Sequence, residues 1–98
     1  MDIYELILSE SPKKVEHLLY RREPEGIGIV LNESLGCIDY LNPTAATIFE
    51  LCNGTKQIRN IVEIIFNQFE IEITKPEVVK DTIKCIRDLE GRKLLKHG

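Results

Sequence analysis

The chain has 98 residues, 43% of them apolar, so it can enclose one modest core, and we expect a single compact domain. Its 13 basic and 16 acidic residues give a net charge of −3 without a concentrated basic patch, which disfavours a nucleic-acid-binding protein. The sequence contains neither an apolar stretch of about 20 residues, which a transmembrane helix requires, nor the basic start of a secretory signal. We therefore expect a soluble cytoplasmic protein that does not contact a membrane.

The first residues predict an N-terminal arm, residues 1–14, that precedes a domain of residues 15–98. The apolar segment Ile3–Leu8 is followed by the polar segment Ser9–Lys14, in which Pro12 interrupts regular helix. We expect the apolar segment to add a strand to the sheet of its own domain or to that of a second copy, which would make the protein a homodimer. A disordered arm is the alternative.

Three short strands are predicted after the arm. Residues 15–20, 27–31 and 37–41 are rich in types that favour strands, and turn-forming residues separate them at Glu23–Gly26 and Asn32–Gly36. Because each connection is short, neighbouring strands should pair antiparallel. This part of the sequence predicts a three-stranded antiparallel meander.

The hydrophobic pattern changes at Asn42-Pro43, where asparagine can cap a helix and proline suits its first position. We expect this helix to end at Asn53-Gly54, residues that suit a left-handed C-terminal cap. Thr55 can then cap a second helix, whose apolar residues recur three and four positions apart. That apolar stripe consists of Ile58, Ile61, Val62, Ile65 and Phe69.

A third helix is predicted from Pro76-Glu77, because proline fits the first turn and an acidic residue is stabilised by the positive end of the helix dipole. Gly91 should end this helix, after which residues 93–96 suit a short closing strand or a frayed tail. The apolar positions that fall on one face of it are Val79, Thr82, Ile86 and Leu89.

Three strands followed by three helices, with a tight Asn53-Gly54 corner between the first two helices, predict an α+β fold of the winged helix-turn-helix type. Some proteins of this type read DNA with a basic recognition helix in the major groove. In the third helix, however, acidic residues offset the basic residues Lys80, Lys84 and Arg87. We expect no nucleic-acid partner, and a DNA-binding transcriptional regulator is the alternative function.

The cysteines give no indication of a metal site or of catalysis. Cys37, Cys52 and Cys85 are odd in number and widely spaced, and the sequence offers only His17 and His97 as imidazole partners. Without a Cys-x-x-Cys pair, this pattern favours neither a disulfide framework nor a zinc site. A nucleophilic cysteine would need His17 beside it and a third group to orient that histidine, which the spacing neither shows nor excludes. We expect no catalytic residue, no metal and no cofactor.

The segment 40–54, with the sequence YLNPTAATIFELCNG, resembles a stretch of the PqqD family that runs leucine-asparagine-x-threonine-alanine and then isoleucine-x-x-leucine-x-aspartate or asparagine-glycine. The family continues with a threonine-led helix, which Thr55 and the following Ile58-x-x-Ile61-Val62 match. Its last helix has an aspartate-led apolar pattern, which Asp81-Thr82, Ile86 and Leu89 match. The resemblance covers residues 15–96 in the same order and at similar spacing.

Three positions depart from the family pattern. Asn53 stands where aspartate is common, and Thr82 stands where valine is common. Gly91 lies two residues before the position at which the family often has glycine. The last departure affects the expected C-terminal turn and leaves the expected fold unchanged.

The resemblance implies a non-catalytic domain that binds the leader of a ribosomally made precursor peptide and presents it to a modifying enzyme, usually a radical S-adenosylmethionine enzyme. The leader would extend the sheet at its third strand, an edge with unpaired backbone groups, beside a groove walled by the third helix. The candidate peptide-binding residues are Cys37, Ile38, Asp39, Tyr40 and Leu41 on the strand and Lys80, Ile83, Lys84 and Arg87 on the helix. The same residues also fit ordinary roles, the strand residues as sheet core and the basic residues as a solvated helix face.

Overall fold

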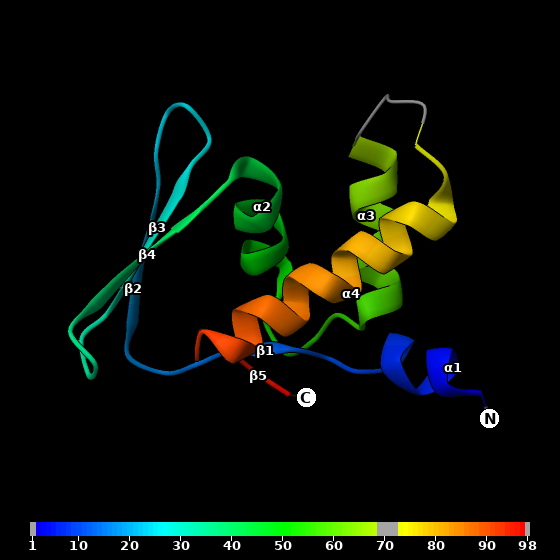
Figure 1. Ribbon diagram of the computed structural model, residues 1–98, viewed down its shortest axis with the longest axis horizontal. Coiled ribbons are helices and arrows are strands. Elements are labelled where there is room, and N and C mark those ends of the chain that lie inside the picture. The colour runs from blue at the N-terminus through cyan, green and yellow to red at the C-terminus, as the bar shows by residue number, and fades with distance from the viewer. Residues whose placement is uncertain (1, 69–72, 98) are drawn as a thin grey trace.

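A computed structural model of the chain describes residues 2–68 and 73–97. Its α+β elements follow in the order α1 (Ile3–Leu8), β1 (Lys13–Lys14), β2 (Leu18–Arg22), β3 (Gly28–Asn32), β4 (Cys37–Leu41), α2 (Pro43–Leu51), α3 (Ile58–Gln68), α4 (Lys75–Gly91) and β5 (Leu95–Lys96). Figure 1 shows the three-stranded sheet at one end of the molecule and α3 at the other, with α2 between them. Among the described residues, no helix combines the length and the apolar character that crossing a membrane requires.

The larger sheet has the strand order β2-β3-β4 with antiparallel pairing, which confirms the predicted meander. Across its second hairpin, Leu31 lies opposite Ile38. The first strand begins at Leu18, three residues later than predicted. The reason is a competing contact, since the N–H of Val15 donates to the carbonyl of Leu94 at 3.0 Å and thereby joins the C-terminal segment instead of the sheet.

Helix α2 starts as predicted and ends differently. The side chain of Asn42 accepts a hydrogen bond from the N–H of Ala45 at 2.8 Å, which is the predicted N-cap. At the other end Cys52 is the C-cap. Gly54 has a φ of 84°, a conformation that glycine adopts without strain, and its N–H donates to the carbonyl of Pro12 at 3.0 Å. The glycine therefore ties the corner to the N-terminal arm instead of closing the helix.

The predicted N-cap of the next helix is wrong. Thr55 donates its N–H and its hydroxyl to the side chain of Asn53, and α3 begins only at Ile58. The asparagine side chain organises this corner as a local turn, so the threonine is used in the turn and is not available to the helix.

The core lies between α2, α3, α4 and the inner face of the sheet. The stripe predicted for α3 is confirmed for Ile58, Ile61, Val62 and Ile65, whereas Phe69 lies outside the described residues. The buried residues of α4 are Val78, Thr82, Ile86 and Leu89, so Val78 replaces the expected Val79. Both valines stand at a helical spacing from Thr82, which is why the pattern did not distinguish them. The helix ends at Gly91, as predicted.

The N-terminal segment Ile3–Leu8 folds as helix α1, so the prediction that it adds a strand is wrong. The side chain of Asp2 accepts hydrogen bonds from the N–H groups of Tyr4 and Glu5 at 2.6 and 3.2 Å. The apolar pattern of this short segment is compatible with a helix or a strand, and the N-cap at Asp2 favours the helix. Helix α1 packs against α3. A homodimer through this arm would therefore need a contact other than an added strand, and it stays a prediction.

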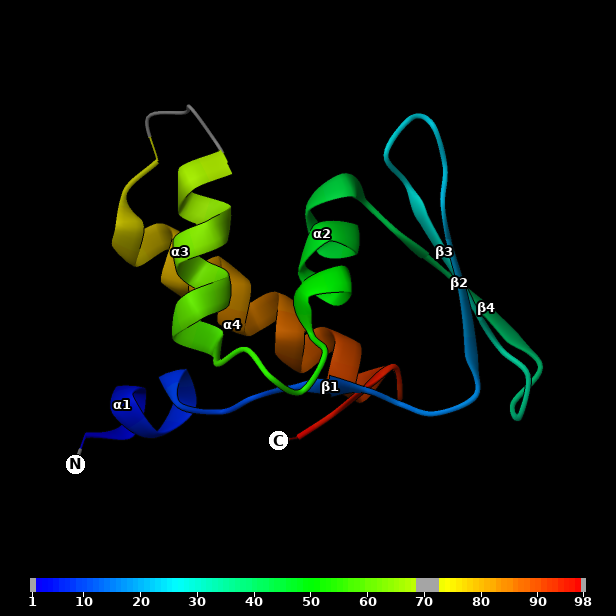
Figure 2. The same cartoon turned by 180° about the vertical axis from the view of Figure 1, so that it is seen from behind.

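The segment after α1 fastens the arm to the domain. Strand β1 pairs antiparallel with β5, with Lys14 opposite Leu95, and Figure 2 shows these two segments passing beneath the helices. Nζ of Lys14 donates to the carbonyls of Glu50 and Cys52 at 3.2 Å each. A cation is favoured at these C-terminal carbonyls of α2. The arm therefore belongs to the packed structure and helps to hold α2 in place.

Side chains from β2 fix α2 to the inner face of the sheet. The hydroxyl of Tyr20 donates to the carboxylate of Glu50, and Arg22 pairs with the same carboxylate at 2.9 Å. The ring of Tyr20 packs against that of Phe49 with the centroids 5.1 Å apart. Burial, together with the hydrogen bond to Glu50, raises the pKa of Tyr20 to about 12.

Tyr20→Phe is expected to lower the free energy of unfolding by about 1 kcal/mol near neutral pH, because Glu50 loses a hydrogen bond. The folded chain holds the tyrosine proton more tightly than the unfolded chain, so the contribution of Tyr20 is complete below pH 10.0 and is lost as the pH rises to about 12. Urea unfolding should show the difference between wild type and variant shrinking across this pH range. A difference that stays constant across it would contradict the assignment.

Candidate functional site

Strand β4 is an edge of the three-stranded sheet. It pairs with β3 on one side, and no strand among the described residues pairs with its other side. The carbonyl of Tyr40 accepts a hydrogen bond from Nη1 of Arg92 at 3.4 Å, so this carbonyl points away from β3. Because alternate residues of an antiparallel strand direct their N–H and C=O to the same side, Ile38 shares the outward direction. The edge therefore offers the N–H and C=O of Ile38 and the N–H of Tyr40, while the carbonyl of Tyr40 is paired with Arg92.

The side chains of β4 divide between the two faces of the sheet. Ile38 and Tyr40 share the outer face and are 57% and 66% exposed, whereas Leu41 on the inner face is 2% exposed. Asp39 is half-buried and Cys37 is exposed. Leu41 is therefore core, while Ile38 and Tyr40 combine backbone groups that face away from β3 with exposed apolar side chains, the combination that other chains can bind.

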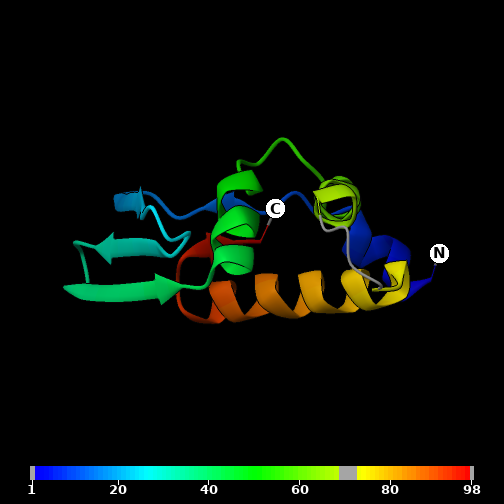
Figure 3. The same ribbon diagram turned by 90° about the horizontal axis from the view of Figure 1, so that it is seen from above.

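A groove of about 560 Å³ opens beside β4. Its walls are the end of β4, the start of α2 and the C-terminal half of α4. Figure 3 shows β4 and α4 at one level, with α2 above them in that view. The groove thus lies directly next to Tyr40, one of the residues whose backbone faces outward.

The helix face in the groove differs from the predicted one. The groove-lining residues of α4 and its C-cap are Asp81, Lys84, Cys85, Asp88, Leu89 and Arg92. Their spacing of three and four residues makes them one stripe. Lys84, which was predicted for the site, belongs to it. Lys80, Ile83 and Arg87 do not line it, and a contact between these residues and a peptide stays a prediction. The prediction took these residues as a second face of the helix, whereas the groove follows the flank of α4 nearest β4.

Arg92 ties α4 to β4, and the sequence prediction missed it. As the C-cap of α4 it lies 3.0 Å from Asp88 and 3.7 Å from Asp39, in addition to its bond with the carbonyl of Tyr40. A cation at the C-terminus of a helix is stabilised by the dipole, and this position next to Gly91 is the signal that could have identified it. Arg92 gives the groove a positive charge between two acidic groups.

An apolar pocket of about 280 Å³ adjoins the groove on the side of the core. Side chains from α2, α3 and α4 line it. Groove and pocket share the residues Asn42, Ala45, Asp81 and Cys85. The two hollows are therefore neighbours, separated by the side chains that line both.

The thiols of Cys52, which is buried, and Cys85, which is half-buried, are poorly suited to nucleophilic chemistry. Burial raises the pKa of Cys52 to about 12 and that of Cys85 to about 11, so both thiols stay protonated near neutral pH. An activated thiol requires a lowered pKa, and the changes here go in the opposite direction. Cys37 is an exposed free thiol at the start of β4.

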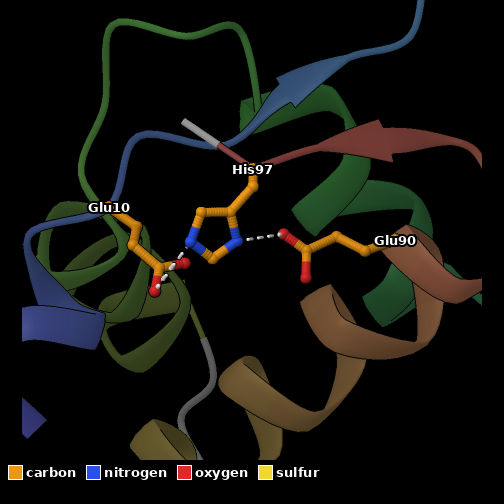
Figure 4. A group of neighbouring side chains, drawn as sticks. All are labelled: Glu10, Glu90 and His97. Atoms are coloured by element: carbon orange, nitrogen blue, oxygen red, sulfur yellow. Dashed lines mark ion pairs between the residues drawn. The ribbon is translucent and has the colours of Figure 1, made fainter. Parts of the chain in front are cut away.

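Glu10, Glu90 and His97 gather away from the groove, with their ligand atoms within 4.8 Å of one another (Figure 4). Nε2 of His97 lies 3.4 Å from Glu10 and Nδ1 lies 3.5 Å from Glu90, so the two nitrogens face different carboxylates instead of converging on one point. Arg87 donates to both oxygens of Glu10, at 2.9 and 2.8 Å. This geometry favours an ion cluster that joins the arm, α4 and the C-terminal residues over a metal centre.

Residues 28–95 match the family model described as coenzyme PQQ synthesis protein D (PqqD). Two solved structures share the fold. TbiB1 in complex with the TbiA(beta) leader peptide has 20% identity and a TM-score of 0.75, and the match covers 86% of this chain and 94% of that one. Lasso peptide synthetase B1 complexed with the leader peptide has 15% identity and a TM-score of 0.74, with 88% and 98% covered. A search of curated proteins found no match. Because the family model spans more than half of the sequence, including β4 and α4, the chain belongs to the PqqD family.

Proposed function

We propose that this domain binds the leader of a ribosomally made precursor peptide by adding it as a strand to β4. The observation that carries the proposal is the free edge of β4 beside the groove, where the backbone groups of Ile38 and Tyr40 face outward. Both structural relatives are complexes with a leader peptide, which supports the same class of ligand for this chain. An extended peptide satisfies such an edge with its own N–H and C=O groups, and its side chains alternate between the two faces of the sheet.

The proposed role is recognition without catalysis. Asp81 and Asp88 stand in the groove with Lys84 and Arg92, so charged side chains of a peptide find partners of either sign. Within the described residues, the raised pKa values of Cys52 and Cys85 keep these thiols protonated near neutral pH, and the cluster around Glu10 lies outside the groove. We assign the domain to a cytoplasmic pathway in which it presents the peptide to a modifying enzyme, of the radical S-adenosylmethionine class by the family resemblance.

We class the arrangement as winged helix-turn-helix-like, a type that also serves DNA-binding regulators. The surface of α4 argues for a peptide, because the two acidic and two basic side chains in its groove-lining stripe cancel. A helix in the major groove passes between rows of phosphates and requires a net positive charge. Binding of duplex DNA is therefore the outcome that would replace the proposal.

The proposal is tested by titrating the isotope-labelled domain with overlapping synthetic peptides from any short reading frame found beside its gene. We expect the largest amide shifts at Ile38, Tyr40 and the groove-lining stripe of α4. A second peptide series carries one N-methyl group each, placed at successive nitrogens. Because only alternate residues of the added strand point their N–H groups at β4, methylation should weaken binding at every second position.

Scrambled peptides of the same composition serve as the control for charge and hydrophobicity. Equal sensitivity to methylation at consecutive positions would contradict strand addition. If no peptide binds and duplex DNA shifts the signals of α4, the domain is a DNA-binding protein and the proposal is overturned.

A further inference from the structure

The outer face of the three-stranded sheet is apolar and exposed. The core packs against the opposite face, through Val30 and Leu41. On the outer face, residues that lie opposite each other form two rows across β2, β3 and β4. One row is Leu19, Leu31 and Ile38, and the other is Arg21, Ile29 and Tyr40. The solvent face of an antiparallel sheet is usually polar, so these rows indicate a surface that another molecule covers.

The exposed area is large enough for a contact between proteins. Leu19, Ile38 and Tyr40 are 54%, 57% and 66% exposed, and the side chains of β3 between them are half-buried. A patch of this kind measures on the order of 500 Å². Two copies of it would remove about 1,000 Å² from water, which is the lower limit for a specific interface. The patch therefore fits a weak dimer.

The charges on this face suit a second copy of the same chain. Arg21 and Tyr40 lie at opposite ends of one row, on β2 and β4. A two-fold axis along β3 reverses the order of the strands, so it sets Arg21 of each copy over Tyr40 of the other and Leu19 over Ile38. A guanidinium over a tyrosine ring is attractive. The two Arg21 side chains stay at opposite edges, so they do not repel each other.

Arg21 is accessible for such a contact. Its side chain is 74% exposed, although it pairs with Glu23 at 2.6 Å. The six side chains of the two rows include no acidic residue. The net charge of −3 therefore places no carboxylate of these rows against its copy.

We propose that the outer face of the sheet binds the same face of a second copy, with Arg21 of each copy on Tyr40 of the other. Two such sheets pack about 10 Å apart with their strands within about 30° of each other, and the contact is the same patch on both copies. The dimer uses side chains that stand on the sheet, whereas strand addition uses the backbone edge of β4. The inference therefore does not rest on the proposed function, and each copy keeps its edge free.

Sedimentation equilibrium of the full chain tests the dimer. The mean mass should rise from 11.3 kDa towards twice that value between about 10 μM and about 1 mM, because so small an interface gives a Kd on the order of 100 μM. Leu19→Lys places an ammonium group in the contact and should raise the Kd by about tenfold or more. Leu6→Lys is the matched control, because Leu6 lies on α1 and is also 54% exposed. It should leave the Kd unchanged.

An exchange of side chains tests the pairing of Arg21 with Tyr40. Tyr40→Arg sets two cations over each other and should raise the Kd by about tenfold. Adding Arg21→Tyr to this variant restores an arginine over a tyrosine in the dimer, so the double variant should recover to within about threefold of wild type. Within one copy Ile29 lies between the two positions, so only a contact between copies explains the recovery. Circular dichroism and the Tm establish that each variant is folded.

Three results would overturn the inference. A chain that stays monomeric at about 1 mM would leave the face to a different protein. A dimer that Leu6→Lys dissociates and Leu19→Lys does not would place the contact on the N-terminal arm. A double variant as weak as Tyr40→Arg alone would exclude the pairing of Arg21 with Tyr40. The binding of leader peptides is a separate measurement, so its failure leaves this result unchanged.

Discussion

Tyr40→Pro is expected to weaken the binding of a leader peptide by about tenfold to a hundredfold while the domain stays folded. Proline removes the backbone N–H of residue 40, and the peptide carbonyl that would accept from it is left unpaired on burial. This N–H faces away from β3, so the sheet keeps its own hydrogen bonds, and edge strands tolerate proline. Calorimetric titration with a peptide that binds wild type measures the loss.

Tyr40→Ala is the matched control for this prediction. It removes a ring that is 66% exposed and keeps the backbone N–H, so most of the affinity should persist. Far-UV circular dichroism and the Tm establish that both variants are folded. An equal loss of affinity in the two variants would assign the interaction to the side chain and contradict strand addition at this residue.

The features that could be predicted from the sequence depend on neighbouring residues. The cap at Asn42 joins a side chain to a backbone group three residues away, and the buried stripe of α3 repeats within one helix. The turn segments between β2, β3 and β4 likewise carry their own signals. These local rules were sufficient to place β4 at the edge of a meander and α4 after it, and hence to predict which strand carries the proposed site.

The features that could not be predicted depend on contacts between distant segments. Lys84 and Arg87 are three residues apart and would share a helix face by spacing alone. In the structure Lys84 lines the groove, whereas Glu10 from the arm draws Arg87 to the other flank. The arm also provides the bond from Gly54 to Pro12 that changes the end of α2. No local pattern specifies the position of the arm. Its contact with Arg87 is therefore the reason why sequence spacing alone did not show which flank of α4 lines the groove.

The unpaired hydroxyl of Thr82 belongs to the same group of unpredictable features. Its position on the buried face of the third helix followed from the spacing with Ile86 and Leu89. Whether a hydrogen-bond partner is within reach depends on how α2 and α3 pack around it, and this packing also creates the pocket.

Arg87→Leu is expected to lower the free energy of unfolding by about 2 to 3 kcal/mol. Arg87 donates to both oxygens of Glu10 and lies 2.9 Å from Glu90, and the side chains of these two acids are only 14% and 17% exposed. Removing one partner of a fully buried ion pair costs about 3 to 5 kcal/mol, and the 36% exposure of the Arg87 side chain reduces this value through solvent screening. The loss leaves two largely buried carboxylates with only His97 between them.

Lys84→Leu, on the groove side of the same helix, is the matched control and should change the free energy of unfolding by about 0.5 kcal/mol or less. Because the cluster joins α4 to the arm, Arg87→Leu should also loosen the hydrogen bond from the N–H of Ile58 to the carbonyl of Glu10, which measures 2.8 Å. Amide exchange at Ile58 should therefore accelerate more than exchange in the sheet. Equal destabilisation by the two variants, or unchanged exchange at Ile58, would show that the arm is held by its apolar contacts and by β1 without help from the ion cluster.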